Sequence, residues 1–345
     1  MSMKPVSNPL LRVLAVTNTW PTGGHYRGIF VKEQVEALRR LGVHIDVEVI
    51  AQHRGRRDYL LAIWRVRRRA LTGRYDLIHI HHGLAALAAR FAGPTPRVLT
   101  LYGHDVLWHW QRWFTALGCG GVAARIYVSR RMATAPGQPG GPVIPDGVDL
   151  DTFTPADRDA ARTILGLPRE DVVILFGGDP RNWVKGYDVF TEVLDVVGER
   201  GMPVRELILA EPGLARHDIA RKFAAADVLL FTSRQGFEGS PSVVKEACAM
   251  GLPVVSTDVG DVGEILENVT PSAVVKFPGT KDQLIRQLAQ HTIEIVTQRR
   301  RSNGPDHISW LSLNAIATRV LEVYHDTTLP TQPRPPVPHP QVSIT

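Results

Sequence analysis

Residues 236–265 read GFEGSPSVVKEACAMGLPVVSTDVGDVGEI, and this stretch decides the fold of the second half of the chain. Ser240 is a suitable N-cap, and Pro241 suits the first position of a helix because proline lacks the N–H group that would be unsatisfied there. Apolar residues then recur at helical spacing until Gly251 and Pro253 end the helix. The sequence therefore predicts a loop and a helix, followed by the apolar strand Val254–Ser256.

The start of this helix is a candidate anion site. Its first N–H groups, around Ser242 and Val243, have no partner within the helix and suit an anion such as phosphate. Glu238 precedes the site in a loop, and Glu246 lies inside the helix. This frame suits a nucleoside diphosphate bound to a sugar, with the diphosphate at the helix start and one glutamate toward each end. From spacing alone, an ordinary capped helix with two surface glutamates explains the pattern equally well.

The order of residues favours the first interpretation. The stretch resembles the signature of the retaining nucleotide-sugar glycosyltransferases of family 4, in which seven residues separate two glutamates. The matching positions are Glu238, Gly239, Pro241, Glu246, Ala247, Ala249, Gly251, Pro253, Val254 and Val255. The resemblance reaches to about Tyr324, and its further segments are 28–38, 75–83, 144–149, 183–188 and 258–264.

Composition fits a globular chain of two domains. The 345 residues are 44% hydrophobic and 21% charged, and we find no signal peptide and no apolar run long enough to span a bilayer. The two cysteines, Cys119 and Cys248, lie far apart and show no metal-type spacing. We therefore expect a cytoplasmic protein.

The formal net charge of +6 makes an acidic partner plausible. Much of the excess lies in one predicted helix that carries Arg65, Arg67, Arg68 and Arg69 beside Trp64. Such a helix suits an anionic membrane surface, while a solvated arginine face on a core helix is the alternative. No nucleic-acid-binding module is recognisable, so we expect no nucleic-acid partner.

Strands and helices alternate along the chain, which predicts doubly wound parallel sheets. The pattern restarts after a Pro- and Gly-rich interval at 136–145. We predict an α/β chain of two doubly wound Rossmann-like domains, with an N-terminal acceptor-side domain at 1–150 and a nucleotide-sugar-binding domain at 151–305. The resemblance implies that the two face each other across a cleft (the GT-B fold) and that 306–326 crosses back onto the first domain. The Pro-rich tail at 327–345 is expected to be disordered.

The resemblance also implies roles for individual residues. Lys185 is expected to bind the diphosphate as a catalytic cation, and Glu238 to bind hydroxyls of the donor sugar, while Glu246 would bind the ribose. The family has an arginine five residues before this lysine, where the chain has proline, so Arg181 is the candidate for that role. The other expected donor-binding residues are Gly23, Gly24, Gly239, Ser240, Ser242 and Val243.

Two departures from the family pattern affect the site. The family carries a histidine after the fourth strand where this chain has Tyr102, and His104 follows two residues later. We expect His104 to act in catalysis, although a solvated loop histidine is the alternative. The second domain is also shortened between Gly213 and Ala226, a region that contributes to the nucleobase pocket in relatives, which leaves the base open.

These observations predict a retaining glycosyltransferase that uses a nucleotide sugar, most simply a UDP-sugar. The acceptor would be a saccharide, a lipid-linked sugar or a natural product, as in polysaccharide assembly at the cytoplasmic face of a membrane. No cofactor or metal is expected, because the helix N-terminus and Lys185 can balance the diphosphate charge. His79, His81 and His82 alternate on a strand and therefore do not suggest a metal site. The alternative is a catalytically weak homologue that binds a nucleotide or acts as a scaffold.

Overall fold

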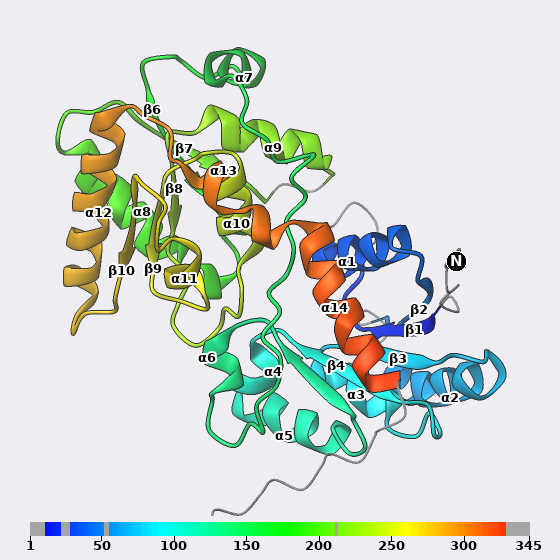
Figure 1. The fold of residues 1–345 in the computed structure, drawn as a ribbon. Helices are drawn as coiled ribbons and strands as arrows, with labels where there is room; N and C mark the ends of the chain where they lie inside the picture. The colour runs from blue at the N-terminus through cyan, green and yellow to red at the C-terminus, as the bar shows by residue number, and fades with distance from the viewer. Residues whose placement is uncertain (1–10, 22–27, 52–54, 211–212, 329–345) are drawn as a thin grey trace, which may run out of the picture.

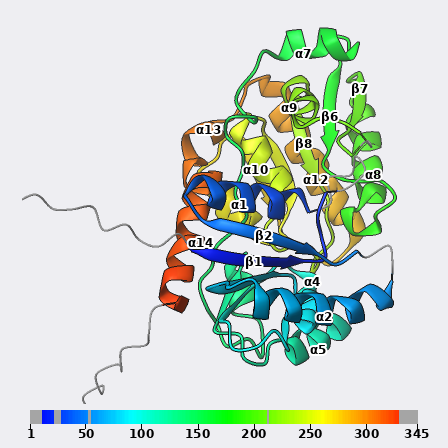
Figure 2. The same ribbon diagram turned by 90° about the vertical axis from the view of Figure 1, so that its right-hand side faces the viewer.

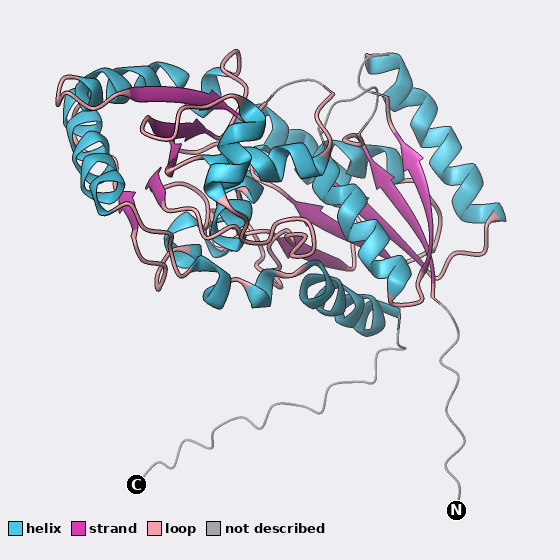
Figure 3. Cartoon of the chain, turned by 90° about the horizontal axis from the view of Figure 1, so that it is seen from above, coloured by secondary structure: helices cyan, strands magenta, loops and turns pink. Residues whose placement is uncertain are grey.

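The computed structural model describes residues 11–21, 28–51, 55–210 and 213–328, and the side chains of Arg56, His104 and His109 fall outside that description. Two parallel sheets of five strands each organise the chain, and helices enclose the strands of both (Figures 1 and 3). The prediction of two Rossmann-like α/β domains is thereby confirmed.

The first sheet has the strand order β2-β1-β3-β4-β5, with every neighbouring pair parallel. Its strands are β1 (Arg12–Thr17), β2 (His44–Val49), β3 (Leu77–His81), β4 (Arg97–Leu101) and β5 (Ala124–Tyr127). Its helices are α1 (Ile29–Arg40), α2 (Arg56–Thr72), α3 (Gly83–Ala89), α4 (His104–Leu107), α5 (His109–Gly118) and α6 (Arg130–Ala133). The largely apolar stretches 12–17 and 97–101 form β1 and β4.

The two faces of this sheet separate by residue parity, because successive side chains of a strand point to opposite faces. Val13 and Ala15 of β1 pack in the core with α1, whereas Leu14 and Val16 pack in the core with α2 and α3. Figure 2 shows α1 on the side of the sheet nearer the second domain, with α2 and α5 on the far side. Function at the domain junction therefore involves α1, while α2 and α5 face outward.

The second sheet has the order β10-β9-β8-β6-β7 and is also wholly parallel. Its strands are β6 (Val172–Phe176), β7 (Val204–Ile208), β8 (Val228–Phe231), β9 (Val254–Thr257) and β10 (Ser272–Val275). Its helices are α7 (Arg158–Leu165), η2 (Trp183–Lys185), α8 (Tyr187–Gly198), α9 (Arg216–Ala225), α10 (Ser242–Ala249), α11 (Val262–Ile265) and α12 (Lys281–Gln298). The sequence did not predict β10, which is a short strand at the sheet edge.

The chain returns to the first domain through α13 (Gly304–His307), η3 (Ser309–Leu311) and α14 (Leu313–Thr328). In Figure 1 the orange-red α14 lies beside the blue α1. Buried Ile316, Val320 and Tyr324 of α14 join the same core as α1. The helix extends to Thr328, so the tail expected from 327 begins in a helix, and 329–345 lie outside the described residues.

No helix within the described ranges is both long enough and apolar enough to span a bilayer.

Candidate donor site

Helix α10 begins one residue later than predicted. Pro241 occupies the N-cap, and the Ser240 hydroxyl donates to Asp261 Oδ2 at 2.6 Å instead of capping the helix. The prediction of Ser240 as N-cap is therefore wrong, because its hydroxyl is committed to a buried carboxylate. Val244 N–H donates to the Pro241 carbonyl, which leaves the N–H groups of Ser242 and Val243 at the helix start. The anion site predicted from the sequence keeps these two donors.

Lys185 and Glu238 meet at this helix start. The Lys185 Nζ lies 2.6 Å from Glu238 Oε1, and the Ser233 hydroxyl donates to the same oxygen at 2.8 Å. Both charged side chains are largely buried, with 25% of the lysine and 13% of the glutamate side chain exposed. The structure thus brings together two residues that are 53 positions apart in sequence and that the resemblance assigns to one donor.

The loop that carries Lys185 is fixed by close backbone contacts. Gly186 has φ +66°, and a Cβ there would lie 2.2 Å from the Thr232 carbonyl oxygen. The Thr232 hydroxyl in turn donates to the carbonyl oxygens of Lys185 and Gly186. Gly178, which follows β6, leaves room for the Lys185 stem, because a Cβ would come within 2.7 Å of it. Sequence reasoning missed Gly178, although a Gly-Gly pair after a buried strand is the signal that could have identified it.

The second glutamate belongs to a different cluster. Glu246 Oε1 lies 2.9 Å from Arg216 Nη2, and the same nitrogen lies 3.0 Å from Glu33 Oε1 in α1. The guanidinium also stacks 4.6 Å from the centroid of Phe153, and its Nε has no hydrogen-bond partner among the described residues. Burial, assisted by Glu246 and Asp149 and opposed by Arg216, raises the pKa of Glu33 to about 7. The expected ribose site therefore contains an arginine and a carboxyl group from the first domain that the sequence did not indicate.

A buried lysine bonds to the loop that precedes α10 and to the interdomain segment. Lys245 is fully buried in α10 and donates to the carbonyl oxygen of Asp146 at 2.8 Å. Burial raises the pKa of Asp146 to about 6, and burial also raises that of Asp261 to about 6, while the Lys245 charge opposes both shifts. Because Asp261 accepts from Ser240, this group of charges ties the Gly239–Ser240 loop to the interdomain segment.

The first domain contributes backbone contacts at the same place. A Cβ on Gly239 would lie 2.2 Å from the carbonyl oxygen of Tyr102, and one on Gly103 would lie 3.1 Å from that of Phe237. The loops that follow β4 and β8 therefore touch, which places the carboxyl ends of both sheets at the domain junction. Ligands of doubly wound sheets bind at these ends.

Tyr102 itself is bonded within the first domain. Its hydroxyl lies 2.7 Å from His81 Nδ1. His79 contacts Tyr324 and Thr100 through its two ring nitrogens, and burial lowers its pKa to about 3. These histidines are therefore neutral packing groups in this structure. The side chain of His104 lies outside the described residues.

Other predicted donor residues do not join the cluster. Arg181 pairs with Asp179 at 2.9 Å, with 84% of its side chain exposed, and it makes no described contact with Lys185 or Glu238. Its side chain is held by a neighbour two residues away rather than by the site. Gly23 and Gly24 lie outside the described residues. Within the described ranges, no group of three or more His, Cys, Asp or Glu residues is placed to hold a metal ion.

Both domains match models of known protein families. A family model described as "Glycosyltransferase Family 4" matches residues 13–152, and one described as "Glycosyl transferases group 1" matches residues 193–297. Together these matches take in most of both domains. The chain belongs to glycosyltransferase family 4.

Curated relatives share limited identity with this chain. A D-inositol 3-phosphate glycosyltransferase of Xylanimonas cellulosilytica is 34% identical over 154 residues, which is 36% of this chain and 36% of that protein. The chain thus spans about a third of that relative. D-inositol 3-phosphate glycosyltransferase 1 of Catenulispora acidiphila is 26% identical over 308 residues, which is 73% of this chain and 72% of that protein.

Among solved structures, Anabaena HepE in complex with UDP superposes on this chain with a TM-score of 0.65 at 17% identity. The match covers 92% of this chain and 100% of HepE. At this identity the similarity establishes the GT-B fold but does not identify the substrates.

Proposed function

We propose that the protein transfers a sugar from a nucleotide-sugar donor, most simply a UDP-sugar, to a hydroxyl acceptor with retention of configuration. The observation that carries the proposal is the contact of Lys185 with Glu238 at the start of α10. This contact joins a cation and a carboxylate in the loop that precedes α10, and we assign the carboxylate to hydroxyls of the donor sugar and the first N–H groups of α10 to the diphosphate. A diphosphate bound there places the donor sugar toward Glu238. The UDP bound to HepE, a protein of the same fold, supports the choice of donor.

The chemistry follows from where charge develops. When the bond between the sugar and the diphosphate breaks, negative charge appears on the leaving phosphate. The Lys185 ammonium and the α10 N–H groups stabilise this charge. In the front-face path that we propose, the acceptor hydroxyl attacks from the side of the leaving group, and a phosphate oxygen takes its proton. This arrangement accounts for the charge with groups of the chain and requires neither a carboxylate nucleophile nor a metal ion.

The donor role of Lys185 is tested by comparing Lys185→Ala with Arg181→Ala. A panel of nucleotide sugars screened by thermal shift identifies the donor, because a bound ligand stabilises the folded state. Titration calorimetry with that donor should show roughly a tenfold to hundredfold weaker affinity for Lys185→Ala, the loss expected for charge-assisted hydrogen bonds. The exposed Arg181→Ala variant should bind as the wild type does. Equal affinities in all three proteins would remove the proposed site.

The reaction course has its own test. Proton NMR of the anomeric coupling in the product, from reactions that contain EDTA, reports stereochemistry and metal dependence together. We expect a retained configuration and full activity. An inverted product would overturn retention, and activity lost with EDTA and restored by Mg²⁺ would overturn the charge argument. Nucleotide binding without sugar transfer to any acceptor would favour the alternative of a catalytically weak homologue.

The acceptor side of the proposal involves the outer face of the first domain. Arg65 is engaged by Glu48 and Asp58 and Arg69 by Glu48, so the basic surface predicted from α2 reduces to Arg67 and Arg68. Large apolar side chains are exposed beside them on α2, α5 and the end of α3: Leu60, Leu61, Trp64, Leu71, Phe91, Trp110, Trp113, Phe114 and Leu117.

These helices form one continuous outer surface. Arg67 donates to the carbonyl oxygen of Phe91 at 2.8 Å, and Arg90 donates to that of Leu117. Arg68 lies 5.5 Å from the centroid of Trp64. Aromatic side chains beside arginines suit the headgroup region of an anionic bilayer. We therefore propose that this surface seats the enzyme at the cytoplasmic face of a membrane that holds a lipid-linked acceptor, as in polysaccharide assembly.

Vesicle sedimentation tests the membrane contact. Trp113→Ser combined with Arg68→Gln should reduce binding to vesicles that contain anionic lipid, whereas Trp310→Ser, at an exposed tryptophan of η3, should not. Binding of all three proteins to the same extent would remove the proposal.

A further inference from the structure

A cavity lies in the second domain at the opposite end of β8 from the candidate donor site. Its volume is about 240 Å³, and its lining includes Arg158, Asp227, Arg299, Arg300 and Arg301. Asp227 immediately precedes β8, whereas the donor site follows that strand. A length of the sheet therefore separates the two sites.

The one carboxylate in this lining makes its described hydrogen bonds to residues other than the three arginines that follow α12. Asp227 Oδ1 accepts from Arg158 Nη1 at 2.9 Å, and Oδ2 accepts from Arg162 Nη2 at 2.6 Å and from the Val173 N–H at 2.8 Å. These bonds offset the charges of Arg158 and Arg162. No described hydrogen bond joins Asp227 to the three successive arginines that follow α12.

The positive charges of Arg299, Arg300 and Arg301 are only weakly balanced by carboxylates among the described residues. Arg299 lies 4.0 Å from Glu170, and both side chains are mostly exposed. Arg301 donates to the carbonyl oxygens of Ala226 and Ala224, which carry no net charge. Burial, with Arg158 and Arg162 adding to it and Asp227 opposing it, lowers the pKa of Arg301 to about 10. A partly buried guanidinium beside other cations is a position that an anion would stabilise.

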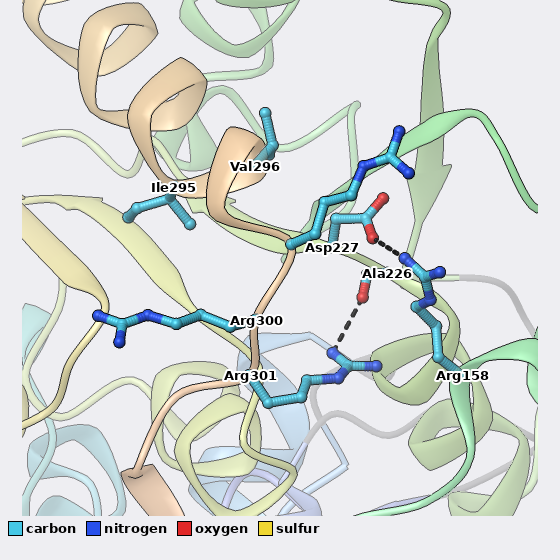
Figure 4. Close-up of a pocket in the computed structure, with 8 residues that line it drawn as sticks. Arg158, Ala226, Asp227, Ile295, Val296, Arg300 and Arg301 are labelled. Atoms are coloured by element: carbon cyan, nitrogen blue, oxygen red, sulfur yellow. Dashed lines mark hydrogen bonds and ion pairs between the residues drawn. The ribbon is translucent and has the colours of Figure 1, made fainter.

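The C-terminus of α12 explains part of this charge, because basic side chains interact favourably with the last carbonyl groups of a helix. It does not explain a cavity. Figure 4 shows Arg158 and Arg301 approaching Asp227 and the Ala226 carbonyl from one side, while Arg300 extends away from them. Ile295 and Val296 supply an apolar wall.

We propose that this cavity binds a small phosphate monoester, with Arg299 and Arg301 on the phosphate and the apolar wall against its carbon skeleton. Planar guanidinium groups match phosphate oxygens in a forked geometry. The volume exceeds the roughly 30 Å³ that one water molecule occupies in the liquid, so it admits a ligand larger than water. The site is separate from the donor site, and its ligand acts as an effector or stabilising ligand rather than as the donor.

Titration calorimetry of the full chain with inorganic phosphate and with glycerol phosphate, at constant ionic strength set by chloride, tests the site. We expect both probes to bind the wild type and the ester to bind more tightly. Arg299→Gln should weaken both by about tenfold, the loss of one charged hydrogen-bond partner. Arg300→Gln removes the same charge from the neighbouring residue that extends away, and it should change affinity much less. Donor affinity should be equal in all three proteins.

Several results would overturn the proposal. An equal loss of phosphate affinity in Arg299→Gln and Arg300→Gln would show a diffuse charge effect rather than a binding site. Binding of inorganic phosphate without binding of the ester would remove the assignment to a monoester. Displacement of either probe by the nucleotide sugar would place the anion in the donor site instead.

Discussion

Replacing Glu33 with glutamine tests the charged cluster at the domain junction. Glu33 has 12% of its side chain exposed and lies 3.0 Å from Arg216, which also contacts Glu246. Its pKa is about 7 in the folded protein against 4.5 for the free group. Between these two values the folded protein holds a proton on Glu33 that the unfolded chain has released.

The sign of the effect follows from proton linkage. Because the folded state binds more protons in this window, the contribution of Glu33 to stability is present below pH 4.5 and is lost as the pH rises to about 7. A difference of about 2.5 pKa units corresponds to roughly 3 kcal/mol. Glutamine cannot ionise, so relative to the wild type the Glu33→Gln variant should gain up to this amount between pH 4.5 and pH 8.

Urea unfolding at pH 5, 6, 7 and 8, followed by tryptophan fluorescence, measures this difference. Subtracting the variant from the wild type cancels the contributions of Asp146 and Asp261, whose pKa values are also raised. Glu36→Gln is the matched control, since Glu36 lies one turn further along α1, half exposed and 3.7 Å from Lys32. A stability difference between Glu33→Gln and the wild type that does not change with pH would refute the reasoning.

Three further substitutions test the framework around the donor site. Gly239→Ala should abolish transfer and lower stability by about 1 to 3 kcal/mol, because its Cβ would overlap the carbonyl oxygen of Tyr102 across the domain junction; wild-type activity measured in that variant would contradict it. Lys245→Met should lower the free energy of unfolding, measured in urea at pH 8, by about 3 kcal/mol, because buried Asp146 and Asp261 lose their cation. The loss should be smaller near pH 5, where both aspartates are protonated. Arg162→Met should lower the free energy of unfolding by a similar amount at both pH values, because it removes five hydrogen bonds, one of them to Asp227. The exposed Arg169→Met variant is the control. If Arg162→Met lowers the midpoint of thermal unfolding by less than this control does, the prediction is wrong.

Local patterns in the sequence predicted most elements of the sheets. The strands β1, β4 and β6 are each a largely apolar run of five or six residues, which is typical of a buried parallel strand. β10 was not predicted, since Ser272–Val275 is four residues long and lies at a sheet edge. Boundaries shifted where a side chain had a distant partner, as when Ser240 bonds to Asp261 rather than to the helix start.

In the candidate site, too, some contacts could be predicted from the sequence and others could not. The contact of Lys185 with Glu238 was expected because both residues match a family motif. Arg216 and Glu33 could not be predicted, since their contact joins helices of different domains and neither residue belongs to a local pattern. Arg181 lies one residue after the family's arginine position, which is proline here, and its backbone N–H and side chain both donate to Asp179. Contacts that depend on how two domains meet leave little signal in the spacing of residues.

The return of α14 to the first domain bears on how the protein folds during synthesis. The second domain is continuous in sequence, so all its strands are available as soon as β10 has left the ribosome. The core that receives Ile316, Val320 and Tyr324 stays incomplete until α14 follows. Domains generally fold as units during synthesis, but here the earlier-made domain depends on a later-made helix. We therefore expect the apolar face of the first sheet to be a site for chaperone binding on the nascent chain, and the second domain to reach its final fold first.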